Sequence, residues 1–192
     1  MVKIKICGMT NIDDCLAAVD LGVDFIGFVF YSKSPRYVTP QAVQAMVGRL
    51  GRSVKTVGVF VEGPDDNIDR VMDLCGLDYA QIYTGRAGPR RIKVYRVGTC
   101  VPEVAGHGLI LFDSCSQGLG GSGTSFDRKL LENHDALDRA FIAGGVSEKN
   151  VEDVLALNPF GVDLVSSVEK RKGKKDLFKM ERLVDRIRSY VL

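Results

Sequence analysis

Two side chains suited to proton transfer stand where an apolar run of the sequence ends. Cys7 precedes a glycine after the run 2–6, and Asp113 follows the run 109–112. A thiol whose pKa is brought down from ~8.5 toward neutrality can act as a base or a nucleophile. A partly buried carboxyl can have its pKa raised and can then act as a general acid. The alternative is that Cys7 is a small core residue and that Asp113 caps a loop.

Other positions have the chemistry to bind anions. Arg36 follows Lys33 and Ser34 in a loop, where it would either clamp a substrate carboxylate through paired hydrogen bonds or stay solvated at the surface. Gly144 and Gly145 separate an apolar run from a helix start, and backbone amides in that position bind phosphate. Turns also need glycine, so the pair alone is a weak signal.

Two further segments invite a role near such a site. The glycine-rich stretch 118–124 lacks the Gly-Lys-Ser/Thr ending of a nucleotide P-loop. It predicts either a loop that closes over the site or a flexible linker. The basic run 170–175 predicts a solvated face, with attraction of a phosphorylated substrate as the second hypothesis.

The elements that must position these residues alternate along the chain. Eight short apolar or β-branched runs predict strands, and several are apolar on both faces, as in parallel sheets covered by helices. The predicted strands are 2–7, 24–30, 55–61, 79–83, 93–97, 109–112, 140–143 and 161–165. Apolar residues at helical spacing predict helices at 11–21, 41–50, 65–74, 147–157 and 178–191.

This alternation predicts an α/β fold, a (β/α)₈ TIM barrel formed as a single domain by residues 1–192. The connections after the fourth and fifth strands are too short for full helices, so the helices there should be shortened. An open doubly wound sheet is the alternative, although the first turn, residues 7–10, lacks its glycine pattern. In a barrel, Cys7, Asp113 and the glycine pair would meet at the carboxyl ends of the strands.

Composition narrows the function classes. The 192 residues carry 26 Lys and Arg against 24 Asp and Glu, and 45% of them are hydrophobic. These values exclude a disordered chain and give no electrostatic case for nucleic acid. No apolar run reaches the ~18 residues of a membrane span, and the start lacks the apolar stretch of a signal peptide. Five widely spaced cysteines and two histidines predict neither a zinc site nor a disulfide framework. We therefore expect a cytoplasmic protein with reduced cysteines and no metal.

The chain opens with a distinctive motif, Lys5-Ile6-Cys7-Gly8-Met9-Thr10. This motif resembles the K-I-C-G-[IM]-T start of the phosphoribosylanthranilate isomerase family of tryptophan biosynthesis. Further matches follow in the same order at 27–30, 34–37, 57–61, 111–114, 120–123, 126–127, 143–145, 150–151, 161–163, 168–169 and 173–176. The similarity covers nearly the whole chain, and the ordered set is more specific than any one motif.

The resemblance implies a barrel that isomerises N-(5′-phosphoribosyl)anthranilate to 1-(2-carboxyphenylamino)-1-deoxyribulose 5-phosphate, an Amadori rearrangement that needs no metal or cofactor. The family's general acid falls on Asp113, which would protonate the ribose ring oxygen. The family's general base falls on Cys7, which would take the proton from C2′. Arg36 matches the arginine that meets the anthranilate carboxylate. The other positions implied to bind substrate are Tyr83 near the anthranilate ring, Asp163 near the ligand, and Gly144, Gly145, Ser166 and Ser167 at the phosphate.

The chain departs from the family pattern in four places. Tyr83 stands where the family usually has histidine, and Arg128 stands where tryptophan is common. The segment 165–169 displaces one hydroxyl and one glycine of the family's Ser-Ser-Gly-Val-Glu, which affects the expected phosphate contacts. The fourth helix is nearly deleted. Apolar barrel surface left uncovered there would be covered by a second copy, so a homodimer is the protein partnership that we expect.

Two alternative functions compete with the isomerase. One is another phosphosugar isomerase or epimerase barrel, which the changes at Tyr83 and after the eighth strand would favour. The other is a non-catalytic relative that binds a phosphate ligand, against which the presence of both Cys7 and Asp113 argues. The expected partner is a small-molecule phosphosugar, and neither nucleic acid nor a membrane has support in the sequence.

Overall fold

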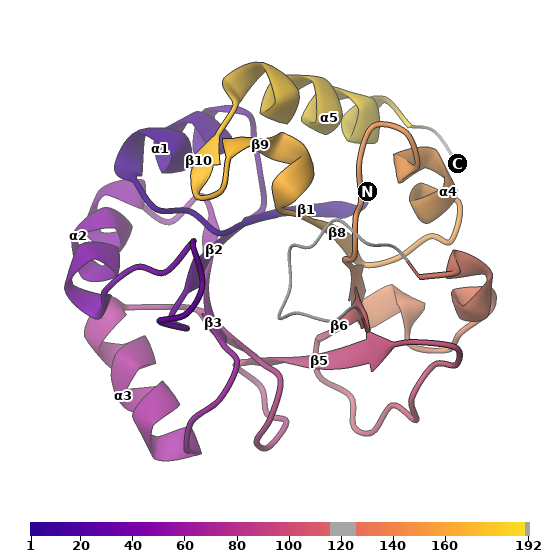
Figure 1. Cartoon of the computed structure of the whole chain (residues 1–192), viewed down its shortest axis with the longest axis horizontal. Helices are drawn as coiled ribbons and strands as arrows, with labels where there is room; N and C mark the ends of the chain where they lie inside the picture. The colour runs from indigo at the N-terminus through magenta and orange to yellow at the C-terminus, as the bar shows by residue number, and fades with distance from the viewer. Residues whose placement is uncertain (116–125, 191–192) are drawn as a thin grey trace.

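The computed structural model describes residues 1–115 and 126–190, and in these ranges eight parallel strands close into a barrel. Each strand pairs with the next along the chain, and β1 pairs with β8 to complete the ring (Figure 1). The strands are β1 Lys3–Cys7, β2 Phe25–Val29, β3 Lys55–Phe60, β4 Tyr79–Ile82, β5 Arg91–Val97, β6 Ile110–Ser114, β7 Ala140–Ile142 and β8 Gly161–Leu164. The predicted (β/α)₈ barrel is confirmed, and the open doubly wound sheet is wrong.

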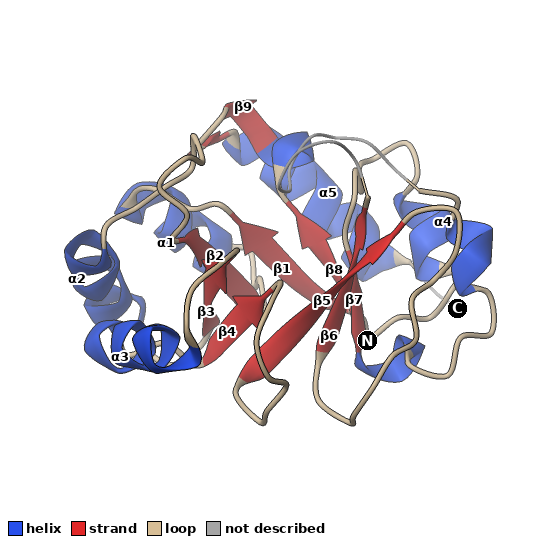
Figure 2. Ribbon diagram, turned by 60° about the horizontal axis from the view of Figure 1, so that its bottom comes forward, coloured by secondary structure: helices blue, strands red, loops and turns tan. Residues whose placement is uncertain are grey.

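Helices cover the outside of part of the barrel, as Figures 1 and 2 show. They are α1 Ile12–Asp20, α2 Pro40–Leu50, α3 Asp65–Cys75, α4 Val151–Leu155 and α5 Leu177–Ser189. Local sequence explains where they begin: the Asn11 side chain accepts a hydrogen bond from the Asp14 amide before α1, and Thr39 caps α2, whose first residue is Pro40. None of the described helices combines the length and apolarity that a membrane crossing needs.

The helix predicted at 147–157 is shorter in the structure, because it begins only at Val151. The Asn150 side chain accepts a hydrogen bond from the Ser147 amide and donates one to the Gly145 carbonyl. These contacts hold residues 145–150 as a turn ahead of α4.

The connections after β4 and β5 contain no helix, which confirms that these two segments are cut short. A third shortening was not predicted from the sequence. Between β6 and β7, the described residues 126–139 form only two short 3-10 turns, Arg128–Leu131 and Leu137–Arg139. Figure 1 shows loops rather than long helices outside β5 and β6.

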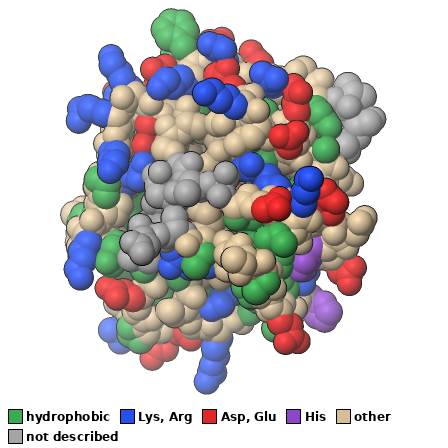
Figure 3. All heavy atoms as spheres, turned by 45° about the vertical axis from the view of Figure 1, so that its right-hand side comes forward, with side chains coloured by type: hydrophobic (Ala, Val, Ile, Leu, Met, Phe, Trp, Pro, Cys, Tyr) green, Lys and Arg blue, Asp and Glu red, His purple; other side chains and the backbone are tan. Residues whose placement is uncertain are grey.

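The apolar surface expected beside the missing helices is not found among the described residues of β4 and β5. The outward side chains Ala80 and Ile82 of β4 are fully buried. Arg91 of β5 reaches back to α3, where its guanidinium lies 2.7 Å from a carboxylate oxygen of Asp69. On the face seen in Figure 3, hydrophobic side chains are scattered among charged ones. The expectation of an uncovered patch is therefore wrong, since long polar side chains and loops replace the helices as cover.

Side chains of the strands alternate between the barrel interior and the layer beneath the helices. The interior holds an apolar cluster of Phe25, Val57, Ile92, Val94, Leu111, Phe141 and Ala143. Phe25 and Phe141 meet edge to face there, with ring centroids 5.1 Å apart. This packed floor fixes the positions of the strands whose carboxyl ends carry the polar residues described below.

Candidate active site

A cavity opens at the carboxyl ends of the strands, where the barrel fold predicts a functional site. Apolar side chains, among them Val29, Val59 and Val146, form part of its wall. Eight of the residues singled out from the sequence line it: Cys7, Arg36, Tyr83, Asp113, Gly144, Gly145, Asp163 and Ser166. Ser167 does not line the cavity, and its hydroxyl oxygen is buried without a hydrogen-bond partner among the described residues.

Cys7 is the last residue of β1, and its thiol faces the cavity. The neighbouring residue on β2 is Gly27, and a Cβ atom there would lie only 2.6 Å from the Cys7 Sγ. Only glycine at position 27 leaves room for the thiol in this place. Burial raises the pKa of Cys7, while the nearby ammonium groups of Lys5 and Lys175 oppose that rise. The thiol is thus a buried group whose charge state depends on its cationic neighbours.

Asp113 lies in β6, with one carboxylate oxygen anchored and the other near a phenol. Its Oδ1 accepts a hydrogen bond of 2.8 Å from the Ser114 amide, and its Oδ2 lies 3.4 Å from the Tyr83 hydroxyl. Burial raises the pKa of Asp113, and the negative charge of Asp163 adds to this rise. A carboxyl in this setting holds a proton more readily than one in water, as a general acid must.

Asp163 of β8 forms a buried ion pair with Lys5 of β1. The Lys5 Nζ lies 2.8 Å from the Asp163 Oδ1, and the two residues are direct partners in the β1–β8 register. Lys5 has no exposed surface. No role for Lys5 follows from the sequence alone, although its spacing of two residues from Cys7 on a strand places both side chains on one face.

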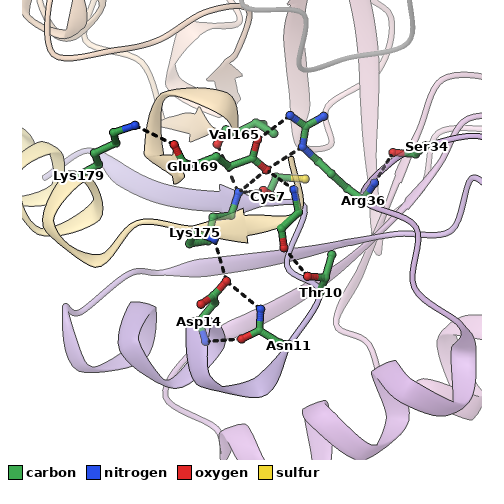
Figure 4. Close-up of polar contacts among 11 residues, drawn as sticks. Cys7, Thr10, Asn11, Asp14, Ser34, Arg36, Val165, Glu169, Lys175 and Lys179 are labelled. Carbon is green, nitrogen blue, oxygen red and sulfur yellow. Dashed lines mark hydrogen bonds and ion pairs between the residues drawn. The ribbon is translucent and has the colours of Figure 1, made fainter. Parts of the chain in front are cut away.

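Arg36 lies at the cavity edge and is held by a carboxylate of this chain. Its Nε and Nη2 donate hydrogen bonds of 2.8 and 2.7 Å to the two oxygens of Glu169, at the start of β9 Glu169–Arg171. The Gly173 amide also donates to Glu169, and Lys175 lies 3.4 Å from it (Figure 4). Arg36 is therefore fixed in place by a buried network.

The basic run 170–175, predicted to be a solvated face, is only partly exposed. It forms a hairpin of β9 with β10 Lys174–Lys175, and Lys175 is buried with its Nζ 2.6 Å from the Cys7 carbonyl oxygen. Lys174 pairs with Asp14 of α1 at 2.6 Å. The prediction of a solvated face is wrong for Lys175, because a carboxylate and carbonyls distant in sequence bind it. The Lys174 side chain stays partly exposed to solvent beside Asp14.

The buried Glu169 network makes a prediction about stability. We expect Glu169→Gln to lower the free energy of unfolding by about 3–5 kcal/mol, because it leaves Arg36 and Lys175 buried without their counter-charge. Urea unfolding at neutral pH measures this change. Glu152→Gln is the matched control, since the exposed pair of Glu152 with Arg186 should contribute about 1 kcal/mol or less.

The same network sets a pH dependence of stability. Although burial opposes ionisation, the bonds from Arg36 and the charge of Lys175 hold the pKa of Glu169 below its usual 4.5. A carboxyl with a lowered folded-state pKa stabilises the fold above its unfolded pKa, and this contribution is lost as the pH falls through the folded value. Glu169→Gln should therefore lose less stability than the unaltered protein below pH 4.5. Equal acid sensitivity in the two proteins would contradict this account.

The glycine pair after β7 forms a turn at the cavity rim. Gly144 and Gly145 have φ angles of 74° and 72°, which favour glycine. The sequence predicted that their amides lie at the start of a helix. In the structure they lie ahead of α4, because that helix begins only at Val151. Arg128 donates a hydrogen bond of 3.2 Å to the Gly144 carbonyl and thereby fixes the turn. The stretch 118–124, predicted as a closing loop, lies outside the described residues.

A metal centre has no support in the described part of the chain. Residues 1–115 and 126–190 contain no group of three histidine, cysteine, aspartate or glutamate side chains placed to hold a metal ion. The cavity instead joins a thiol, a carboxyl and positions suited to anions around an apolar wall. Such a set can move protons on an anionic organic substrate.

Comparison with known proteins identifies relatives over the full barrel. Residues 4–186 match the family described as N-(5'phosphoribosyl)anthranilate (PRA) isomerase. The N-(5'-phosphoribosyl)anthranilate isomerase of Rubrobacter xylanophilus is 35% identical over 207 aligned residues, which cover 98% of this chain and 100% of the relative.

Solved structures agree with this match. The phosphoribosyl anthranilate isomerase of Thermus thermophilus superposes with a TM-score of 0.83 at 31% identity, covering 98% of this chain and 99% of its own. Monomers generated from the dimeric phosphoribosylanthranilate isomerase of Thermotoga maritima superpose with a TM-score of 0.80 at 28% identity, covering 99% of this chain and 100% of their own. The likeness therefore extends over sequence and fold together.

Proposed function

The chain belongs to the N-(5′-phosphoribosyl)anthranilate isomerase family, and on this premise we propose that Cys7 and Asp113 are the base and the acid of its reaction. The enzyme is an aldose–ketose isomerase of tryptophan biosynthesis, and its reaction is an Amadori rearrangement, an intramolecular oxidation and reduction. The observation that carries the proposed roles is that one buried thiol and one buried carboxyl line the same cavity.

The proposed reaction begins with two proton transfers and ends with a tautomerisation. Asp113 donates its proton to the ribose ring oxygen, the bond from that oxygen to C1′ breaks, and the anilino nitrogen supplies electrons to form an iminium ion. The Cys7 thiolate then removes the proton from C2′. The electron pair of that C–H bond forms the C1′–C2′ double bond of an enolamine and neutralises the iminium ion. Tautomerisation to the ketone completes the reaction without an external oxidant or reductant.

The substrate's two anionic groups fix its orientation in this proposal. The contact of Arg36 with Glu169 engages Nε and Nη2, so we assign Nη1 to the anthranilate carboxylate. Gly144, Gly145 and Ser166 bind the phosphate across the cavity. Ser167 is not assigned a phosphate contact, because it lies outside the cavity lining.

The remaining predicted binding residues contact the middle of the substrate. Tyr83 faces the anthranilate ring beside the apolar wall, and Asp163 accepts from a ribose hydroxyl or the anilino nitrogen. The Tyr83 hydroxyl also remains near Asp113, so one side chain borders both the aromatic ring and the proton donor.

The first experiment is a direct assay of turnover. The purified protein is mixed with freshly prepared phosphoribosylanthranilate, and the loss of anthranilate fluorescence is followed. We expect rapid loss that depends on enzyme concentration. No loss above the spontaneous rate would refute the assignment, and turnover of ribulose 5-phosphate alone would point to a different phosphosugar reaction.

Cellular context and assembly are further parts of the proposal. We infer a single-domain cytoplasmic enzyme that forms a homodimer, an association supported by the dimeric relative from Thermotoga maritima. Size-exclusion chromatography with light scattering tests the assembly. A mass of about twice the 21.0 kDa of one chain is expected, and a uniform species at 21.0 kDa at micromolar concentration would contradict it.

A further inference from the structure

Lys5 is a charged side chain sealed inside the barrel directly beneath the site. It is 0% exposed and does not line the cavity, whereas its partner Asp163 does. Replacing a buried ion pair by apolar residues of similar volume is often neutral or stabilising, so stability alone is a poor reason for this pair. Its position next to the thiol of Cys7 points to a role in the chemistry.

Lys5 lies close enough to Cys7 on β1 for the two side chains to interact electrostatically. The two residues are two positions apart on one strand, so their side chains share the inner face. Asp163 faces them from β8 and holds the Lys5 Nζ at 2.8 Å. Burial alone would lower the pKa of Lys5, but the charges of Asp163 and Cys7 outweigh it and raise that pKa, so Lys5 stays protonated.

The other charged groups around Cys7 do not replace Lys5. Lys175, from β10, donates to the backbone carbonyl oxygen of Cys7 at 2.6 Å and lies 3.4 Å from Glu169, so it contacts the backbone of Cys7 and does not share a strand face with the thiol. Asp163, from β8, opposes ionisation of the thiol. Tyr83 and Asp113 line the same cavity from β4 and β6, and neither supplies positive charge. Lys5 is therefore the cation on the same strand face as the thiol.

We propose that Lys5 is a positioning residue for proton abstraction, which favours the thiolate of Cys7 while Asp163 holds its ammonium in place. This inference rests on the proposed role of Cys7 as the base. Lys5 keeps its protons throughout: the proton from C2′ goes to sulfur, and the electron pair of the C–H bond goes to the substrate. Burial raises the pKa of Cys7, and the Lys5 ammonium limits that rise, so loss of the ammonium would make the thiolate that accepts the proton still less populated.

The test is a pH titration that follows the ultraviolet absorbance of the Cys7 thiolate. The absorbance of the same protein carrying Cys7→Ser is subtracted at each pH, so that only Cys7 contributes to the difference. In Lys5→Met, the midpoint of the Cys7 titration should rise by about 1–3 pH units, the size expected for loss of a nearby opposite charge. The rate of Cys7 alkylation and kcat/KM at neutral pH should fall by the same factor as the thiolate fraction. In Lys5→Arg, the Cys7 midpoint should lie close to that of the unaltered protein, because arginine keeps the positive charge.

Two comparison variants keep the test decisive. Lys3→Met removes the exposed lysine two residues earlier on β1, which pairs with Asp24, and should leave the Cys7 midpoint unchanged. If Lys5→Met fails to fold because Asp163 is left unpaired, Lys5→Met combined with Asp163→Asn removes both charges. Its midpoint should still lie above that of the unaltered protein, because the cation is lost.

The outcomes separate this inference from the proposed function. The role of Lys5 would be overturned if the Cys7 midpoint moved by less than about half a pH unit both in Lys5→Met and in Lys5→Met combined with Asp163→Asn. Full turnover by the Cys7→Ser protein would instead refute the role of Cys7 as the base. The titration is read without turnover, so it decides the effect of Lys5 on the thiol in either case.

Discussion

Replacing Cys7 by serine is expected to lower kcat by about 10²–10⁴-fold, the usual loss when a general base is removed. A serine hydroxyl is close in size but ionises at far higher pH than a thiol, so it cannot take the C2′ proton. KM should change little, because the proposed binding contacts come from Arg36, the glycine turn and Ser166. Steady-state kinetics by anthranilate fluorescence measures both constants.

The pH profile gives Cys7→Ser a second readout. The base must be ionised, and burial raises the pKa of Cys7, so one limb of the pH profile of the unaltered enzyme should follow the titration of this thiol. That limb should disappear in the variant. Cys100→Ser is the matched control, since Cys100 is exposed in the loop after β5 and should leave kcat unchanged. A Cys7→Ser enzyme that retains more than about a tenth of kcat would place the base elsewhere.

The sequence could predict the barrel and the meeting of Cys7 with Asp113 because both follow from local patterns. Apolar runs alternating with helical spacing define parallel strands, and the carboxyl ends of parallel strands in a barrel face one side. Cys7 and Asp113 stand at two such ends. The register between strands then brings residues distant in sequence to the same cavity.

The ionic contacts could not be predicted in this way. Lys5 and Asp163 are 158 positions apart, and Arg36 and Glu169 are 133 positions apart. Pairing at such separations depends on strand register and on the hairpin of β9 with β10, which composition does not encode. A lysine-rich run is most often solvated, so only the fold shows that Lys175 is drawn inward by Glu169 and a backbone carbonyl.

The start of helix α4 could not be predicted from the sequence either. A periodic apolar pattern predicted a helix over 147–157, yet a side chain that bonds nearby backbone delayed its start to Val151. Asparagine and serine offer the backbone alternatives to helical hydrogen bonds, and tertiary contacts at the glycine turn decide between them. Sequence periodicity locates such an element more reliably than its ends.

Replacing Asp113 by asparagine is expected to lower kcat by about 10²–10⁴-fold, because an amide of the same shape has no acidic proton to give the ribose oxygen. The sign of the pH effect follows from the raised pKa of Asp113, which burial causes first and the charge of Asp163 second. The acid works while protonated, so its activity is lost as the pH rises above its pKa. The part of the decline of kcat/KM toward alkaline pH that follows the titration of Asp113 should therefore vanish in Asp113→Asn.

Tyr83→Phe separates the acid from its neighbour. The phenol lies 3.4 Å from Oδ2 and favours the ionised carboxylate, so its loss should raise the pKa of Asp113 further and leave the proton donor in place. A neutral hydrogen bond contributes about 0.5–1.5 kcal/mol, so kcat should change by about tenfold or less. Two results together would identify the phenol, and not the carboxyl, as the proton donor. Tyr83→Phe would reduce kcat as severely as Asp113→Asn does, and the decline of kcat/KM toward alkaline pH would persist in Asp113→Asn. The two hydrogen-bonded side chains are thus distinguished by which substitution removes the alkaline decline, and the carboxyl is expected to be the one that does.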